Sequence, residues 1–134
     1  MPSFERVMIV DDNEIDNFVT RRVLEMGDFA SHIEVMTSGK HALEYFEQHK
    51  SNLSMIPDLI LLDLNMPVVD GFVFLFEFDE FAVEIKEKTE IILLSSILEK
   101  RVIDKILTNE YVSDFIPKPL TESSLKRINI RKSA

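Results

Sequence analysis

Four apolar residues, Leu59 to Leu62, stand between Asp58 and Asp63, and this short run constrains the fold more than any other part of the chain. The run is too short for a helix, and apolar side chains on both faces of a strand are typical of a parallel sheet. Because parallel strands need crossover connections, the run predicts an α/β fold. A carboxylate at the end of such a strand, here that of Asp63, lies at the sheet edge where open α/β folds bind ligands.

Apolar runs alternate with segments of helical period along the whole chain. The predicted strands are residues 6–10, 33–36, 59–62, 91–94 and 115–116. The predicted helices are residues 15–26, 39–50, 70–85, 98–107 and 122–131. Five strand–helix units in series predict a doubly wound, five-stranded parallel sheet between two layers of helices, with right-handed crossovers.

Two of the predicted helices carry distinct apolar stripes. The first helix has one stripe, formed by Ile15, Phe18, Val19, Val23 and Met26. The third has two, with Phe74, Phe78, Phe81 and Ile85 on one face and Phe72, Phe76 and Val83 on another. Because the core cannot easily cover both faces of the third helix, we predict that its second stripe is a surface for self-association or for a partner.

Composition narrows the class of protein. A chain of 134 residues, 46% of them hydrophobic, can bury one core, so we expect a single domain over residues 5–131 and no effector domain. A net charge of -9 and a pI near 4.8 argue against direct nucleic-acid binding, which usually needs a basic face. The chain has no cysteine, no signal-peptide pattern and no apolar run of about 20 residues, so we expect a soluble, cytoplasmic protein without a membrane segment.

Polar residues follow four of the five predicted strands and point to one site. Asp11 and Asp12 follow the first strand, Asp63 the third, Ser95 the fourth and Lys118 the fifth. In a parallel sheet these strand ends all open on the same edge. Each residue alone has a structural explanation, such as a helix cap for the aspartate pair or a solvated loop for the lysine. Their occurrence together and in order favours a functional site.

Three carboxylates brought to one edge repel one another unless a cation joins them, and they suit Mg²⁺, or Mn²⁺, as an oxygen-ligated divalent metal. An ionised aspartate is a competent nucleophile towards phosphorus and gives an aspartyl-phosphate. Lys118 can supply a cation and Ser95 a hydroxyl donor for the phosphoryl oxygens. The residues therefore predict metal-dependent phosphoryl transfer to an aspartate.

Four segments carry a resemblance to a known family: residues 7–12, 61–71, 92–96 and 115–119. In sequence and in order they resemble the signature segments of the receiver domain of bacterial two-component response regulators, here of the stand-alone, single-domain type. The resemblance implies a flavodoxin-like sheet with strand order 2-1-3-4-5. It also implies a phospho-accepting signalling domain of a phosphorelay, which catalyses only its own Mg²⁺-dependent phosphorylation and slow dephosphorylation.

The resemblance implies a role for each strand-end residue. Asp63 would be the phosphoacceptor and a metal ligand. Asp12 would ligate Mg²⁺ directly, Asp11 through a water, and Asn65 through its backbone carbonyl. Lys118 would pair with the phosphoryl group.

Further implied roles concern switching and the lifetime of the phosphoryl group. Ser95 would bond the phosphoryl group and draw its strand end inward. Phe115 stands at the position of the switch aromatic, and without a hydroxyl only its packing can report its position. Asn65 and Ile97 would flank the path of the attacking water, and the apolar side chain of Ile97 predicts slow self-dephosphorylation.

Partners also follow from the resemblance. The phosphodonor would be a phosphohistidine on a sensor histidine kinase or on a histidine phosphotransfer protein. Output would pass to a separate protein through the face formed by the fourth helix, the fifth strand and the fifth helix. Whether phosphorylation produces a homodimer stays open.

Other functions fit the residues less well. A haloacid-dehalogenase-type, Mg²⁺-dependent phosphatase needs a second acid two residues after its nucleophile, where this chain has Asn65. A flavodoxin-like cofactor binder needs a phosphate-cradling loop after the first strand, where Asp11 and Asp12 would repel a phosphate. A degenerate receiver that acts as a constitutive interaction module remains an alternative.

Overall fold

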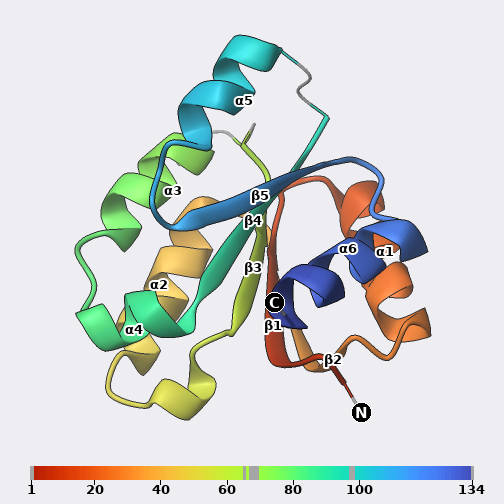
Figure 1. Cartoon of the computed structure of the whole chain (residues 1–134). Coiled ribbons are helices and arrows are strands. Elements are labelled where there is room, and N and C mark those ends of the chain that lie inside the picture. Colours follow the sequence, from red (N-terminus) through yellow and green to blue (C-terminus); the bar gives the residue numbers. More distant parts are fainter. Residues whose placement is uncertain (1, 65, 67–69, 97–98, 134) are drawn as a thin grey trace.

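The computed structural model describes residues 2–64, 66, 70–96 and 99–133. Its centre is a five-stranded parallel sheet in the order β2-β1-β3-β4-β5, which confirms the predicted fold class and strand order (Figure 1). The strands are β1 (Phe4–Val10), β2 (Ala30–Met36), β3 (Leu59–Leu62), β4 (Glu90–Ser95) and β5 (Val112–Pro117). The α-helices are α1 (Glu14–Met26), α2 (Gly39–His49), α3 (Gly71–Phe78), α4 (Val83–Lys88), α5 (Lys100–Ile106) and α6 (Glu122–Ser133), and a 3-10 turn spans Leu53–Met55.

Helices cover both faces of the sheet and enclose a separate apolar cluster on each. Helices α2, α3, α4 and α5 lie on one face, and α1 and α6 on the other (Figure 1). Strands β1, β3 and β4 form the centre of the sheet, and their apolar side chains alternate between the two clusters. Strands β2 and β5 are the edges. Both are longer than predicted, because backbone pairing with the neighbouring strand continues across residues that carry no strand-like apolar pattern.

The register of the sheet brings the two aspartate-ending strands together. Val10 of β1 is paired with Leu62 of β3, and the Asp63 amide donates a hydrogen bond of 2.9 Å to the Val10 carbonyl. On the other side of β1, the Asp11 amide donates to the Met36 carbonyl at 3.0 Å. Asp11 and Asp63 therefore lie next to each other at the carboxyl end of the sheet.

The third predicted helix is two helices in the structure, so the prediction of one continuous helix over residues 70–85 was wrong. Helix α3 ends at Phe78 and α4 begins at Val83. Ala82 between them has an extended backbone, with φ of −60° and ψ of 151°. The Lys86 ammonium donates to the Asp79 carbonyl at 3.0 Å, which stabilises the freed end of α3.

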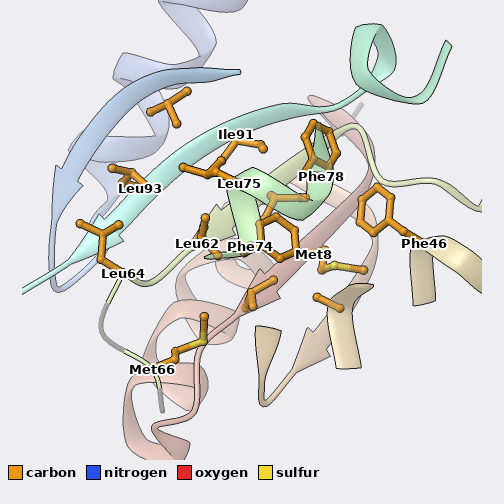
Figure 2. Packing of buried hydrophobic residues seen from close by; sticks show 14 of the residues in the cluster. Met8, Phe46, Leu62, Leu64, Met66, Phe74, Leu75, Phe78, Ile91 and Leu93 are labelled. Atoms are coloured by element: carbon orange, nitrogen blue, oxygen red, sulfur yellow. The ribbon is translucent and has the colours of Figure 1, made fainter. Parts of the chain in front are cut away.

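Phenylalanines from α2 and α3 fill the apolar cluster on the α2–α5 face of the sheet (Figure 2). The rings of Phe46 and Phe78 meet edge to face at 5.7 Å, and the rings of Phe74 and Phe78 stack at 6.1 Å. Phe81 and Ile85 extend this cluster, so the predicted inward face of residues 74–85 is confirmed although the helix is broken.

The second predicted stripe points outward, as expected. Phe72 and Val83 are exposed, and the Phe76 residue retains 71% of its accessible surface. The ammonium of Lys105 on α5 lies 5.8 Å from the centre of the Phe72 ring. Whether this surface has a partner stays a prediction.

Helix α1 turns most of its apolar stripe to solvent, although Val23 is partly buried and packs against the cluster on the α1–α6 face of the sheet. Ile15, Phe18 and Met26 are 75%, 67% and 78% exposed, although an apolar stripe of this kind ordinarily faces the core. The face of α1 that is buried instead is formed by Asn17, Thr20 and Leu24. The side-chain amide of Asn17 donates a hydrogen bond to the Asp11 carbonyl at 2.8 Å, and this contact contributes to the orientation of α1.

None of the helices in the described parts of the chain has the length and apolar character needed to cross a membrane.

Candidate functional site

Three carboxylates meet at the carboxyl end of the sheet. Each of Asp11, Asp12 and Asp63 offers one carboxylate oxygen, and these oxygens all lie within 4.8 Å of one another. Asp11 and Asp63 are buried, whereas Asp12 is exposed. The structure thus brings together the three carboxylates that the sequence predicts, and one of them remains open to solvent.

A short hydrogen-bonded loop fixes the first of these carboxylates. The Asn13 amide donates to Asp11 Oδ1 at 2.9 Å, and Asn13 Oδ1 in turn accepts from the Asp16 amide at 2.9 Å, which caps α1. The side-chain amide of Asn17 donates to the Asp11 carbonyl at 2.8 Å. Both the backbone and the side chain of Asp11 are therefore held by the start of α1.

The start of α3 presses against the segment that follows Asp63. The Gly71 amide donates to the Leu64 carbonyl at 3.0 Å. A Cβ atom at Gly71 would lie 2.9 Å from Leu64 Cα and 3.3 Å from the Asp63 carbonyl oxygen. Only glycine allows this close approach, so Gly71 is needed for the position of the Asp63 backbone.

Lys118 reaches the carboxylates from the end of β5. Its ammonium lies 2.6 Å from Asp11 Oδ2, 2.8 Å from Asp16 Oδ2 and 3.6 Å from Asp63 Oδ2. Burial tends to lower the pKa of this ammonium, but hydrogen bonds to Asp11 and Asp16 and the charges of Asp63 and Asp11 outweigh it and hold the pKa above its ordinary value. Lys118 is therefore a permanent cation in the site at physiological pH.

Two further predicted residues lie around this site. Ser95, the last residue of β4, is fully buried, and its carbonyl accepts a hydrogen bond of 3.0 Å from the Lys118 amide. Phe115 on β5 is partly buried and packs against the cluster on the α2–α5 face of the sheet. The two remaining predicted site residues, Asn65 and Ile97, lie outside the described residues.

Asp16 is a part of the site that the sequence analysis missed. It lies in the first turn of α1, where an acidic residue is commonly explained by the helix dipole. The signal that could have found it is its spacing: Asp16 comes three residues after the Asn13 cap, at the same sheet edge as Asp11. Its contact with Lys118 joins residues 102 positions apart in the chain, which no local pattern reveals.

The donor set suits a hard divalent cation. Carboxylate oxygens are the ligands that Mg²⁺ and Mn²⁺ prefer, and Mg²⁺ usually takes only one or two protein carboxylates and keeps several waters. The exposed position of Asp12 leaves room for such waters. Three carboxylates, those of Asp11, Asp16 and Asp63, contact the Lys118 ammonium, and Asp12 adds a fourth negative charge beside Asp11 and Asp63. This surplus of negative charge favours a cation.

Comparisons with known proteins agree with this geometry. The sequence matches the response regulator receiver domain family over residues 7–129. It is 28% identical over 121 residues to the probable methanogenesis regulatory protein FilR2 of Methanothrix harundinacea, a match that covers 90% of this chain and 76% of that protein. It is 30% identical over 122 residues to a protein-glutamate methylesterase/protein-glutamine glutaminase of Carboxydothermus hydrogenoformans, covering 90% of this chain but only 31% of that enzyme.

A solved structure shares the whole architecture. The two-component response regulator from Cytophaga hutchinsonii superimposes with a TM-score of 0.88 at 27% sequence identity, over 96% of each chain. Its fold and the family match agree with the strand order and with the acidic edge of the sheet. The chain therefore belongs to the receiver domains of two-component response regulators, a family of signalling domains.

Proposed function

We propose that this receiver accepts a phosphoryl group on Asp63 from a phosphohistidine, and that the transfer depends on Mg²⁺ or Mn²⁺. A carboxylate oxygen of Asp63 attacks phosphorus, an O–P bond forms, and the N–P bond to the donor histidine breaks. The observation that carries the proposal is the meeting of Asp11, Asp12 and Asp63 within 4.8 Å, next to the Lys118 ammonium.

Each residue of the site has a part in this transfer. Asp12, Asp11, Asp63 and the Asn65 carbonyl would hold a divalent cation. The cation would neutralise the carboxylates and would also bind a phosphoryl oxygen. Lys118 binds another phosphoryl oxygen, because its ammonium already lies 3.6 Å from Asp63. The buried hydroxyl of Ser95 donates to a third oxygen.

The test is uptake of phosphate from a small donor. We expect acetyl phosphate to add one phosphoryl group to the protein, detected by intact mass, in the presence of Mg²⁺ or Mn²⁺ but not of EDTA. Uptake that needs no metal would contradict the proposed site. No uptake under any condition would instead favour the alternative of a constitutive interaction module.

Phosphorylation changes the face formed by α5, β5 and α6, and this face binds a separate output protein. Movement of Ser95 towards the phosphoryl group draws the end of β4 inward, and Phe115 on the neighbouring strand β5 repacks. The half-buried position of Phe115 gives its ring room to move between two packed states. Since the ring carries no hydroxyl, packing alone transmits the change.

The exposed stripe of α1 is the docking surface for the phosphodonor, a histidine kinase or a phosphotransfer protein. Helix α1 begins at the carboxyl end of the sheet, where the site lies (Figure 1). Asp16 in its first turn contacts Lys118. A protein that brings a phosphohistidine to Asp63 must therefore pass beside this helix. Ile15, Phe18 and Met26 offer that protein an apolar contact.

We expect Phe18→Glu to slow phosphoryl transfer from a histidine kinase or phosphotransfer protein about tenfold or more, because it places a charge within an apolar interface. The donor is one from the same genome that phosphorylates the wild-type protein. Transfer from acetyl phosphate should stay unchanged. Leu53→Glu is the matched control, since Leu53 is 43% exposed and lies in the 3-10 turn that precedes β3, at the other end of the sheet from the site. Equal rates for the two variants with the protein donor would place docking elsewhere.

A further inference from the structure

We propose that Asp16 competes with the incoming phosphoryl group for the ammonium of Lys118, and so limits the rate at which this receiver is phosphorylated. The inference rests on the proposed function and adds to it a carboxylate that is neither the phosphoacceptor nor a member of the three-aspartate cluster. Asp16 is a positioning residue, because it acts on the reaction through Lys118.

The contacts of Lys118 show why a competition arises. An ammonium has three hydrogen atoms to donate. In the structure its two short contacts are with Asp11 Oδ2 at 2.6 Å and Asp16 Oδ2 at 2.8 Å, whereas Asp63 Oδ2 is farther away at 3.6 Å. The two short contacts therefore hold the ammonium towards the start of α1 and 3.6 Å from Asp63 Oδ2, so that a move closer to a phosphoryl oxygen on Asp63 lengthens at least one of them.

Burial decides which partner is given up. The side chain of Asp11 is only 4% exposed, so water cannot take the place of the Lys118 ammonium there. The side chain of Asp16 is 38% exposed, so water can solvate its carboxylate after release. Release from Asp16 is therefore the less costly step, and Asp16 is the partner that the phosphoryl group displaces.

Charge acts in the same direction. Phosphodonors and the transferred group are anionic, and Asp16 adds a negative charge to a site that already has three carboxylates. Exchange of Asp16 by asparagine, a neutral side chain of the same shape, weakens the competing hydrogen bond, because an amide oxygen is a poorer acceptor for an ammonium than a carboxylate, and it removes this repulsion. It removes no member of the three-aspartate cluster.

We expect Asp16→Asn to raise the rate of phosphorylation by acetyl phosphate, at saturating Mg²⁺, about three- to tenfold, the scale of the net contribution of one hydrogen bond. The affinity for Mg²⁺ should change by less than about threefold, since Asp16 lies outside the ligand set. Asp16→Glu, which restores the carboxylate, should return the rate to within about twofold of the wild type. A merely structural role of Asp16 would instead lower the rate and the metal affinity together.

Glu14→Gln is the matched control, because Glu14 is an exposed acid in the same first turn of α1, whereas the carboxylates that contact Lys118 in the described part of the chain are those of Asp11, Asp16 and Asp63. If it accelerates phosphorylation as much as Asp16→Asn, general charge rather than the Lys118 contact sets the rate and the inference is wrong. A second readout is the ¹⁵N resonance of the Lys118 ammonium in the metal-free protein, which Asp16→Asn should shift and Glu14→Gln should not.

The outcomes separate the inference from the proposed function. A wild-type protein that takes up no phosphoryl group contradicts the proposed function itself. A wild-type protein that does take it up, with Asp16→Asn equally fast or slower, contradicts the role of Asp16 alone.

Discussion

We expect Asp63→Asn to abolish the uptake of a phosphoryl group from acetyl phosphate and from a phosphohistidine donor. An amide is not a competent nucleophile towards phosphorus, and the other carboxylates of the cluster have different positions at the sheet edge. The measurement is intact mass after incubation with Mg²⁺ and donor. The variant should stay folded, because it removes one of three carboxylates that repel one another.

Asp70→Asn is the control for this prediction. Asp70 caps α3 by accepting a hydrogen bond of 3.0 Å from the Val73 amide, and asparagine caps a helix about as well as aspartate. This variant should therefore keep both its stability and its phosphoryl uptake. A phosphoryl group that persists in Asp63→Asn would show that another residue is the acceptor.

Phe78→Ala is expected to lower the free energy of unfolding by about 3–5 kcal/mol, the usual cost of truncating a buried aromatic residue to alanine. The ring of Phe78 is fully buried and packs against an aromatic ring of α2 and another in the segment before β5. It lies 5.7 Å from the ring of Phe46 and 5.5 Å from that of Tyr111. The truncation would leave a cavity between α3, α2 and the segment before β5, where these ring contacts are lost.

Urea unfolding followed by circular dichroism measures this cost. Phe76→Ala is the matched control on the same helix, and because Phe76 is exposed its cost should stay within about 0.5 kcal/mol. If Phe78→Ala does not fold, Phe78→Leu gives a smaller loss in the same direction. Similar losses for Phe76→Ala and Phe78→Ala would contradict the assignment of the two faces of α3.

The sequence by itself determined the sheet and most of the site. Apolar runs such as Leu59 to Leu62 can be buried only as interior strands, and a parallel sheet places the ends of such strands on one edge. Asp11, Asp12, Asp63, Ser95 and Lys118 could therefore be assigned to one place from their positions after strands. These are local sequence patterns. In a parallel sheet, the position of a residue directly after a strand is enough to place it at the carboxyl end of the sheet.

Only the tertiary structure decided what surrounds that edge. Most of the apolar stripe of α1 faces solvent, while Asn17 donates a hydrogen bond to the Asp11 carbonyl and Leu24 takes the buried position. Helical periodicity does not tell which face of a helix its neighbours cover. The break between α3 and α4 lies at Ala82, whose backbone is extended, and the hydrogen bond from Lys86 to the Asp79 carbonyl stabilises the end of α3 there. The contact of Asp16 with Lys118 joins the first helix to the residue that follows the last strand. It forms although β3 and β4 lie between β1 and β5, because the start of α1 and the residue after β5 both lie at the carboxyl end of the sheet.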